Sequence, residues 1–226
     1  MPRSASTVGA VVALLSLIAV TGCGAGSAER ADGAASAESG APVETPTPTP
    51  TIEPVETIAT TPISVEDYLS LTEERSADGG VKLEGVQDDY RALAAVFPLA
   101  LPNVYAFPVE SRAANNLDDE KKVQFSATYG ENEVFHFWLD STATAAYASH
   151  LRGDSTAANR YLDAIEDGYA TPIRRHTIED PENGYIADVV DSARRGIFGQ
   201  MILQNVNPFL EIEQYEAVAA QAGDVF

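Results

Sequence analysis

The stretch ENEVFHFWLDSTATAAYASHL, residues 131–151, is the most helix-like part of the chain. Apolar residues recur along it at intervals of three and four, which places them on one side of an α-helix. These residues are Val134, Phe135, Trp138, Leu139, Ala146, Tyr147 and Leu151. Gly153 follows closely, and a glycine is a common residue at a helix end. The stretch therefore predicts a long helix and, with it, a mostly helical fold.

Helical patterns also occupy most of the chain on either side of this stretch. Ser64, with Asp67 three residues later, is typical of a helix start. In the helix expected over 183–204, Gly196 and Gly199 each lower stability by about 1 kcal/mol relative to alanine. The helices that we expect run from Ser64 to the Asp78-Gly79-Gly80 turn, over 86–97, from Ser155 or Thr156 to Gly168, over 183–204 and over 209–221.

Evidence for β-structure is limited to one segment. In VQFSATY, residues 123–129, Val123, Phe125, Ala127 and Tyr129 alternate with polar residues, which favours a strand. We therefore expect residues 63–226 to form a single compact helical domain, mainly α with at most a small sheet, and an α+β fold remains an alternative.

The N-terminus has the features of an export signal. Arg3 precedes an apolar run from Val8 to Val20, which has the length of a signal-peptide core and is short for a membrane span. Val20-Thr21-Gly22 leads from this run into Cys23, which is the only cysteine. A single cysteine cannot form a disulfide within the chain.

The sequence V-T-G-C, ending at Cys23, resembles a bacterial lipobox. The resemblance implies that residues 1–22 are a lipoprotein signal peptide, that cleavage occurs before Cys23, and that a diacylglyceryl group is attached to its sulfur. Two acyl chains of the palmitate kind are enough for stable anchoring, because each buried CH₂ contributes about 0.8 kcal/mol. The expected location is the outer face of the cytoplasmic membrane.

Residues 23–62 have the composition of a tether. The first part is rich in glycine, alanine and serine, and the second contains TPTPTPT. Such a segment buries too little apolar surface to offset chain entropy, so we expect a disordered spacer with an extended Thr/Pro part. Its threonines are candidates for O-glycosylation, with a plain solvated linker as the favoured alternative.

The net charge of −20 and an isoelectric point near 4.3 exclude some partners. Nucleic acid requires clustered lysine and arginine, and anionic lipid attracts basic surfaces, so neither is an expected partner. The lipid on Cys23 must therefore hold the protein at the membrane.

The three histidines are the main candidates for chemistry: His136, His150 and His176. His136 could act as a metal ligand with Glu133, three residues before it, or with Asp140, four residues after it. Neither pair has a second copy or a third ligand in the sequence, so no metal and no cofactor is expected. A partly buried core histidine is the favoured interpretation of His136.

Two arginine doublets and one tryptophan are candidates for ligand or partner contacts. Arg174-Arg175 and Arg194-Arg195 could clamp a carboxylate or phosphate if the fold brought them together, although separate ion pairs are favoured. Trp138 could face a partner, although core packing is the simpler interpretation. Motifs for a nucleophile elbow, a phosphate-binding loop or a zinc protease are absent from the sequence.

The order of lipobox, Thr/Pro tether, FHFWLD and TAAYASHLRGD resembles exported lipoproteins of unknown function from high-GC Gram-positive bacteria. That resemblance implies no activity. The leading hypothesis is a non-enzymatic binding or assembly module that contacts an envelope protein or a cell-wall component. The alternative is an envelope hydrolase with a site around His136 or His150. Solute capture is disfavoured, because the domain is small for a two-lobed binding protein.

Overall fold

The computed structural model describes residues 54–76, 82–116, 125–224 and 226. These residues are mostly helical, as the sequence predicts, and the part that they cover contains no strand. Thr57 and Pro108 pair in an isolated antiparallel bridge. The predicted strand over 123–129 is wrong, because Phe125 is only an isolated bridge position, residues 127–128 form a turn and Tyr129 is already helical. Residues 123 and 124 lie outside the described part.

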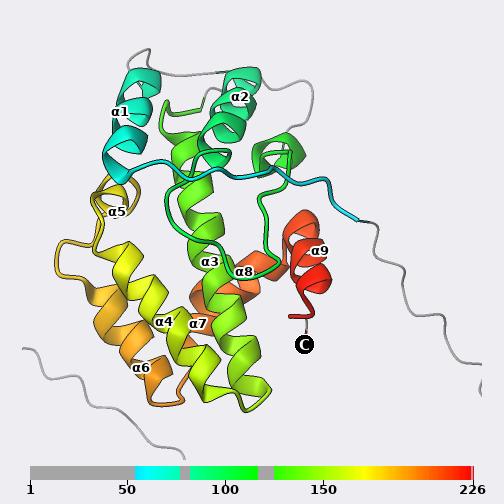
Figure 1. The fold of residues 1–226 in the computed structure, drawn as a ribbon, viewed down its shortest axis with the longest axis vertical. Helices are drawn as coiled ribbons and strands as arrows, with labels where there is room; N and C mark the ends of the chain where they lie inside the picture. Colours follow the sequence, from blue (N-terminus) through cyan, green and yellow to red (C-terminus); the bar gives the residue numbers. More distant parts are fainter. Residues whose placement is uncertain (1–53, 77–81, 117–124, 225) are drawn as a thin grey trace, which may run out of the picture. The chain divides into compact units, whose positions relative to one another are not determined.

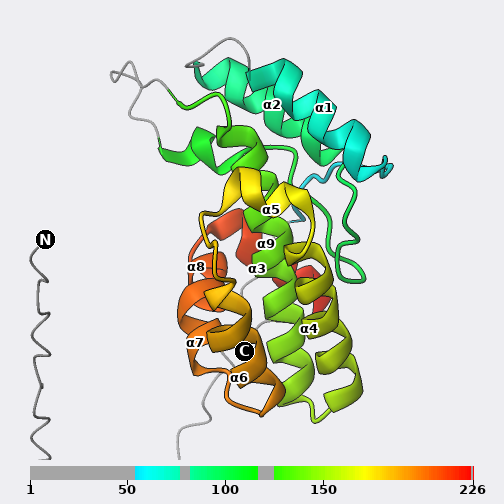
Figure 2. The same cartoon turned by 90° about the vertical axis from the view of Figure 1, so that its left-hand side faces the viewer.

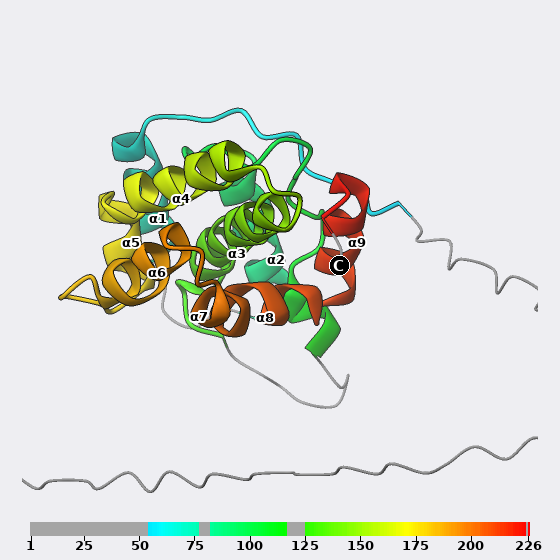
Figure 3. The same ribbon diagram turned by 90° about the horizontal axis from the view of Figure 1, so that it is seen from below.

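Helix α3 (Tyr129–Leu151) is the centre of the fold. It lies between α4 (Ser155–Tyr169) on one side and α7 (Gly199–Met201) and α8 (Asn207–Leu210) on the other (Figure 3). Helix α2 (Leu83–Ala94) also contacts it. Residues on nearly every side of α3 are buried, which is typical of a helix enclosed by others. Helix α3 starts two residues before the stretch from which it is predicted.

The remaining elements cover the sides and ends of α3 (Figures 1 and 2). The helices are α1 (Val65–Ser76), α5 (Pro172–Thr177), α6 (Asp191–Arg194) and α9 (Glu213–Ala222). Residues Arg112–Asn116 form a 3₁₀ turn, and Ile186–Val190 and Ile202–Val206 form π turns. Helices α1, α2, α4 and α9 lie where the sequence predicts helices, whereas α5 was not predicted.

Helix α3 ends as the sequence predicts. Gly153 has a φ of +76°, and its N–H and that of Asp154 donate to the carbonyls of His150 and Ser149. This pattern is a Schellman motif, which needs a left-handed residue at the glycine position. The Asp154 side chain, rather than Ser155 or Thr156, then caps α4 by accepting a hydrogen bond from the Ala157 N–H at 2.9 Å.

The continuous helix predicted over 183–204 is wrong. The chain leaves the helix after Arg194, where Gly196 adopts a φ of +82°. The N–H groups of Gly196 and Ile197 donate to the carbonyls of Ala193 and Ser192, which completes a second Schellman motif. Helical turns resume only at Gly199. Gly196, which the sequence predicts to weaken this helix, therefore ends it.

Residues 54–63 form an extended segment that packs on the helical unit. The Ile58 N–H donates to the Phe107 carbonyl at 2.7 Å, and the Thr61 N–H donates to the Ala95 carbonyl at 2.7 Å. Val55 and Ile58 pack against the core. Composition predicts a tether up to residue 62, but these apolar side chains make the last part of that segment belong to the fold.

Trp138 belongs to the core and does not face a partner. It is 1 % exposed, and its indole N–H donates to the Ala100 carbonyl at 3.1 Å. Its ring packs against Phe97 and Phe135. The core-packing interpretation of Trp138 is thus confirmed.

Candidate functional site

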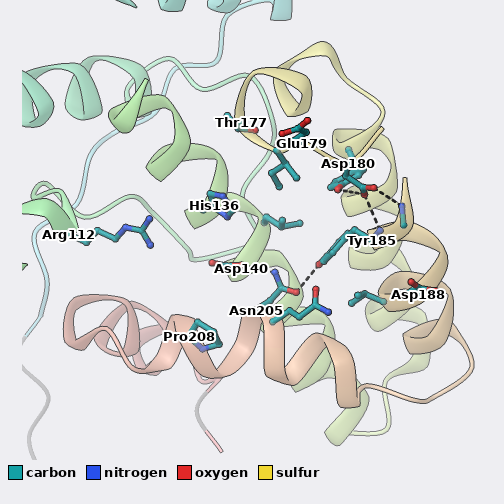
Figure 4. A pocket seen from close by; sticks show the side chains of 16 residues that line it. Arg112, His136, Asp140, Thr177, Glu179, Asp180, Tyr185, Asp188, Asn205 and Pro208 are labelled. Atoms are coloured by element: carbon teal, nitrogen blue, oxygen red, sulfur yellow. Dashed lines mark hydrogen bonds between the residues drawn. The ribbon is translucent and has the colours of Figure 1, made fainter. Parts of the chain in front are cut away.

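A pocket of about 700 Å³ opens beside the middle of α3 (Figure 4). Its walls come from α3, from the chain between α5 and the first π turn, and from the second π turn with the start of α8. Arg112 of the 3₁₀ turn lies at one end and Asp188 at the other. The volume falls within the range of about 300–1,000 Å³ that is usual for small-molecule sites. We call this cavity the Asp140 pocket.

Three polar side chains form a hydrogen-bonded relay along one wall of the pocket. The Tyr185 hydroxyl donates to Asn205 Oδ1 at 2.9 Å, and Asn205 Nδ2 donates to Asp140 Oδ1 at 2.7 Å. Asn205 is 3 % exposed, so its amide depends on these two partners. Because buried polar groups are costly without partners, the relay fixes both the amide and the carboxylate.

Burial determines the charge of the two titratable residues that α3 contributes to the pocket. Burial raises the pKa of Asp140 to about 7, against the lowering effects of the Asn205 hydrogen bond and the Arg112 charge. His136, one helical turn earlier, has a lowered pKa because of burial and the nearby Arg112 charge. At neutral pH the imidazole is therefore uncharged, and the Asp140 carboxyl is close to half ionised.

Asp180 stabilises, through its side-chain hydrogen bonds, the part of the pocket wall formed by the chain between α5 and the first π turn. Its Oδ2 accepts hydrogen bonds from the Tyr169 hydroxyl at 2.7 Å and the Tyr185 N–H at 3.0 Å, and its Oδ1 accepts one from the Gly184 N–H at 2.8 Å. The Tyr169 hydrogen bond is the largest of the contributions that lower the Asp180 pKa. The rings of Tyr169 and Tyr185 stack with their centroids 5.2 Å apart, which gives this wall a rigid aromatic flank.

Arg174 supports the same wall from behind. Its guanidinium donates to the Asp180 carbonyl at 2.9 Å and to Asn183 Oδ1 at 2.6 Å, and it lies 4.9 Å from the centre of the Tyr169 ring. It is 9 % exposed. Arg174 therefore positions the pocket wall and does not present a free cation to a ligand.

The other three arginines of the doublets lie apart from the Asp140 pocket. Arg194 forms ion pairs with Asp163 and Glu166, the latter at 2.7 Å, and Arg195 donates to the Ser192 hydroxyl at 3.0 Å. Arg175 is exposed on α5, and α5 and α6 lie at different ends of α4 (Figure 2). The structure does not bring the two doublets together, so they form no clamp.

Only one of the three histidines lines this pocket. His150 is exposed and stacks on Phe198 with centroids 4.5 Å apart. His176 Nδ1 lies 3.9 Å from Glu131 Oε1. His136 lines the Asp140 pocket, as a partly buried residue on a helix whose other faces are in the core.

The predicted pair of Glu133 and His136 does not form a metal site. Glu133 is 1 % exposed and accepts hydrogen bonds from the Tyr215 hydroxyl at 2.9 Å, the Arg112 N–H at 2.6 Å and the Ser111 hydroxyl. Its pKa is raised by burial. Across residues 54–76, 82–116, 125–224 and 226, no group of three or more His, Cys, Asp or Glu side chains is placed to hold a metal ion.

Most of the pocket is not predicted by the sequence. Arg112, Tyr185 and Asn205 are not among the residues that the sequence marks as candidates. One usable signal was Asn205, a polar residue that follows an apolar stripe and precedes another apolar residue, Val206. A buried asparagine in such a position requires hydrogen-bond partners.

Comparison with protein-family models, characterised proteins and solved structures gave no match for this chain. In the part of the chain that the structure describes, no helix has both the length and the apolar character needed to cross a bilayer. The geometry of the Asp140 pocket and the N-terminal sequence are therefore the features that bear on function.

Proposed function

We propose that this chain is an exported, lipid-anchored protein whose helical domain binds a small polar ligand in the Asp140 pocket. The observation that carries the proposal is the Tyr185–Asn205–Asp140 relay in the wall of a cavity of about 700 Å³. A large concave site with a few fixed polar groups among apolar walls is typical of ligand pockets.

The energetic cost of the relay supports a binding role. Keeping a carboxylate and an amide within a helical bundle costs free energy that apolar side chains of similar size would not cost. Asn205 lies in the second π turn, and Tyr185 directly precedes the first. Such π turns occur often at functional sites, where they redirect side chains that a regular helix would place elsewhere.

The anchored location rests on the sequence of residues 1–23. The V-T-G-C motif ends a signal-like apolar run and contains the only cysteine of the chain. A binding domain held in this way would sample ligands outside the cytoplasmic membrane. The pocket lies within one helical bundle, so this form of binding does not need the two lobes of the usual solute-binding protein.

The hydrolase alternative has less support from the geometry. The residues that line the Asp140 pocket include no serine or cysteine, and the Thr177 hydroxyl donates to backbone carbonyls of α5. A hydrolytic site there would have to activate water with His136 or Asp140. His150 stacks on Phe198 away from these groups.

The proposal is tested by a ligand panel on the full-length chain in detergent micelles. The panel holds small amines, amino acids, carboxylates and neutral sugars, and the readouts are calorimetric titration and the shift in the melting temperature. We expect one chemical class to bind, and Tyr185→Phe to weaken that binding because the relay loses its first donor. Tyr161→Phe removes a hydroxyl on α4 outside the pocket and serves as the matched control. The proposal is wrong if no class binds, or if both variants bind like the native chain.

A further inference from the structure

The relay determines which oxygen of Asp140 is left for a ligand. An ionised carboxylate can only accept hydrogen bonds, so Asn205 must turn its NH₂ group towards Asp140 Oδ1. The amide oxygen then faces Tyr185, whose hydroxyl donates to it. Among the described residues, none donates a hydrogen bond to Asp140 Oδ2. The carboxylate is thus fixed at one oxygen and has hydrogen-bonding capacity at the other.

The charged groups around Asp140 favour a positive ligand. Those that line the pocket with it are Arg112, His136, Tyr169, Glu179, Asp180, Tyr185 and Asp188. The Asp180 carboxylate already accepts three hydrogen bonds. Glu179 and Asp188 are exposed, and Arg112 lies at the end of the pocket opposite Asp188 (Figure 4). Four carboxylates line the pocket against one arginine, so the cleft has an excess of negative charge, and such a cleft concentrates ligands of the opposite sign.

The apolar part of the wall favours an organic ligand over a metal ion. Leu139, Val189 and the stacked Tyr185 ring line the pocket with Asp140. A hard cation requires several oxygen ligands at once, and the described residues provide no such group. An alkylammonium group requires one carboxylate, with apolar surface for its carbon chain.

From this geometry we infer that the ligand of the Asp140 pocket carries an organic ammonium group, which donates to Asp140 Oδ2 while its apolar part packs on Leu139, Val189 and Tyr185. This inference rests on the proposed binding function. The ammonium group could belong to a free small amine or to an amine-bearing polymer of the cell wall, since the contact with Asp140 is the same.

The test titrates the full-length chain in micelles at pH 8 with butylamine, 1,4-diaminobutane, butanol and butyrate. We expect the two amines to bind and the two uncharged or anionic analogues to bind at least about tenfold more weakly, because they cannot donate a charge-assisted hydrogen bond. Asp140→Asn keeps the acceptor for Asn205 and removes the charge, so it should weaken amine binding about tenfold or more. Asp167→Asn removes one carboxylate on α4, outside the pocket, and should leave the affinity within about twofold.

A pH series adds a readout that a structural defect would not reproduce. The Asp140 pKa of about 7 means that the carboxylate becomes ionised as pH rises from 6 to 8, while an alkylamine stays protonated. Amine affinity should therefore rise over this interval in the native chain and in Asp167→Asn. It should stay flat in Asp140→Asn. His136→Gln should keep the rise, which assigns it to Asp140.

The outcomes separate this inference from the proposed function. Butyrate or a sugar binding in place of the amines, with Tyr185→Phe weakening it, overturns the ammonium inference and leaves the pocket function standing. Amine binding that is equal in Asp140→Asn and the native chain also overturns the inference. Absence of binding for every class overturns both. A final titration with soluble, amine-bearing wall fragments distinguishes the two sources, because tighter binding of a fragment than of butylamine assigns the ligand to the wall.

Discussion

Gly168 is a residue of α4 that packs directly against Trp138 of α3. A Cβ atom placed there would lie 2.2 Å from one ring carbon of Trp138 and 3.0 Å from Leu99 Cδ1. Trp138 cannot yield easily, because its ring is enclosed by Phe97 and Phe135 and its N–H is bonded to the Ala100 carbonyl.

We therefore expect Gly168→Ala to destabilise the fold, although alanine favours helices over glycine by about 1 kcal/mol. Overpacking of a filled core costs about 1–3 kcal/mol and outweighs that gain. The measurement is the free energy of unfolding in urea. Gly199→Ala is the matched control, because nothing lies within 4 Å of a Cβ at that position, and it should be neutral or slightly stabilising. Equal effects of the two substitutions would contradict the packing argument.

Glu131 makes the stability of the fold depend on pH. It is 2 % exposed, and burial raises its pKa from 4.5 to about 7. The His176 imidazole lies 3.9 Å away, and the Glu131 charge in turn contributes to the raised pKa of Tyr68. The folded state therefore binds this proton more tightly than the unfolded state does, so the contribution of Glu131 to stability is fully present below about pH 4.5 and is lost as pH rises to about 7. Asp140 acts with the same sign.

Glu131→Gln removes this ionisation. We expect the variant to gain about 1–3 kcal/mol of unfolding free energy at pH 8 and almost nothing at pH 4.5, since each pKa unit corresponds to 1.36 kcal/mol. Urea unfolding at the two pH values measures the difference. Glu73→Gln, an exposed position on α1, is the control and should change neither value appreciably. A gain that is the same at both pH values would show that packing, and not charge, is responsible.

At the scale of elements, the sequence predicts helices well where their signals are local. The 131–151 pattern and Gly153 give α3 and its end, because periodicity and a left-handed glycine are properties of a few neighbouring residues. The strand over 123–129 fails because alternation over so short a segment is weaker than the helix that begins at Tyr129.

The pocket was less predictable than the helices. Its relay joins residues from α3, from the start of one π turn and from another π turn, and a π turn shifts the register of side chains without a sequence motif of its own. His136 and Asp140 could be paired from their spacing, whereas their meeting with Asn205 depends on how the helices pack.

Arg174 and Arg175 provide a test of how the pocket wall is held. The planar guanidinium of Arg174 donates to the Asp180 carbonyl and to Asn183 Oδ1 at the same time. The single ammonium group of a lysine cannot reproduce this geometry. We expect Arg174→Lys to lose about 1–3 kcal/mol of stability and to speed hydrogen exchange at the Gly184 and Tyr185 N–H groups. Arg175→Lys, at the exposed neighbouring position, should change neither. Unchanged exchange in Arg174→Lys would mean that Asp180 alone holds the wall.

At the scale of the whole molecule, the point at which the ordered domain begins determines how far the domain can lie from the membrane. Residues 56–63 form backbone hydrogen bonds with the chain around Ala95, Val96 and Phe107. The folded domain therefore begins before α1. The sequence between Cys23 and Pro54 predicts a spacer, which would reach roughly 90 Å if fully extended. A spacer of that reach would leave the Asp140 pocket accessible to ligands away from the bilayer.

The lipid anchor predicted at Cys23 can be tested by fatty-acid labelling and membrane fractionation. The native chain, expressed in a bacterium that processes lipoproteins, should sediment with membranes and incorporate labelled fatty acid, because two acyl chains hold a protein stably at a bilayer. Cys23→Ala should incorporate no label and appear in the soluble extracytoplasmic fraction, since a net charge of −20 gives no attraction to anionic lipid. Asp140→Asn keeps Cys23 and should sediment like the native chain. If the native chain incorporated no labelled fatty acid and fractionated like Cys23→Ala, the lipobox interpretation would be wrong.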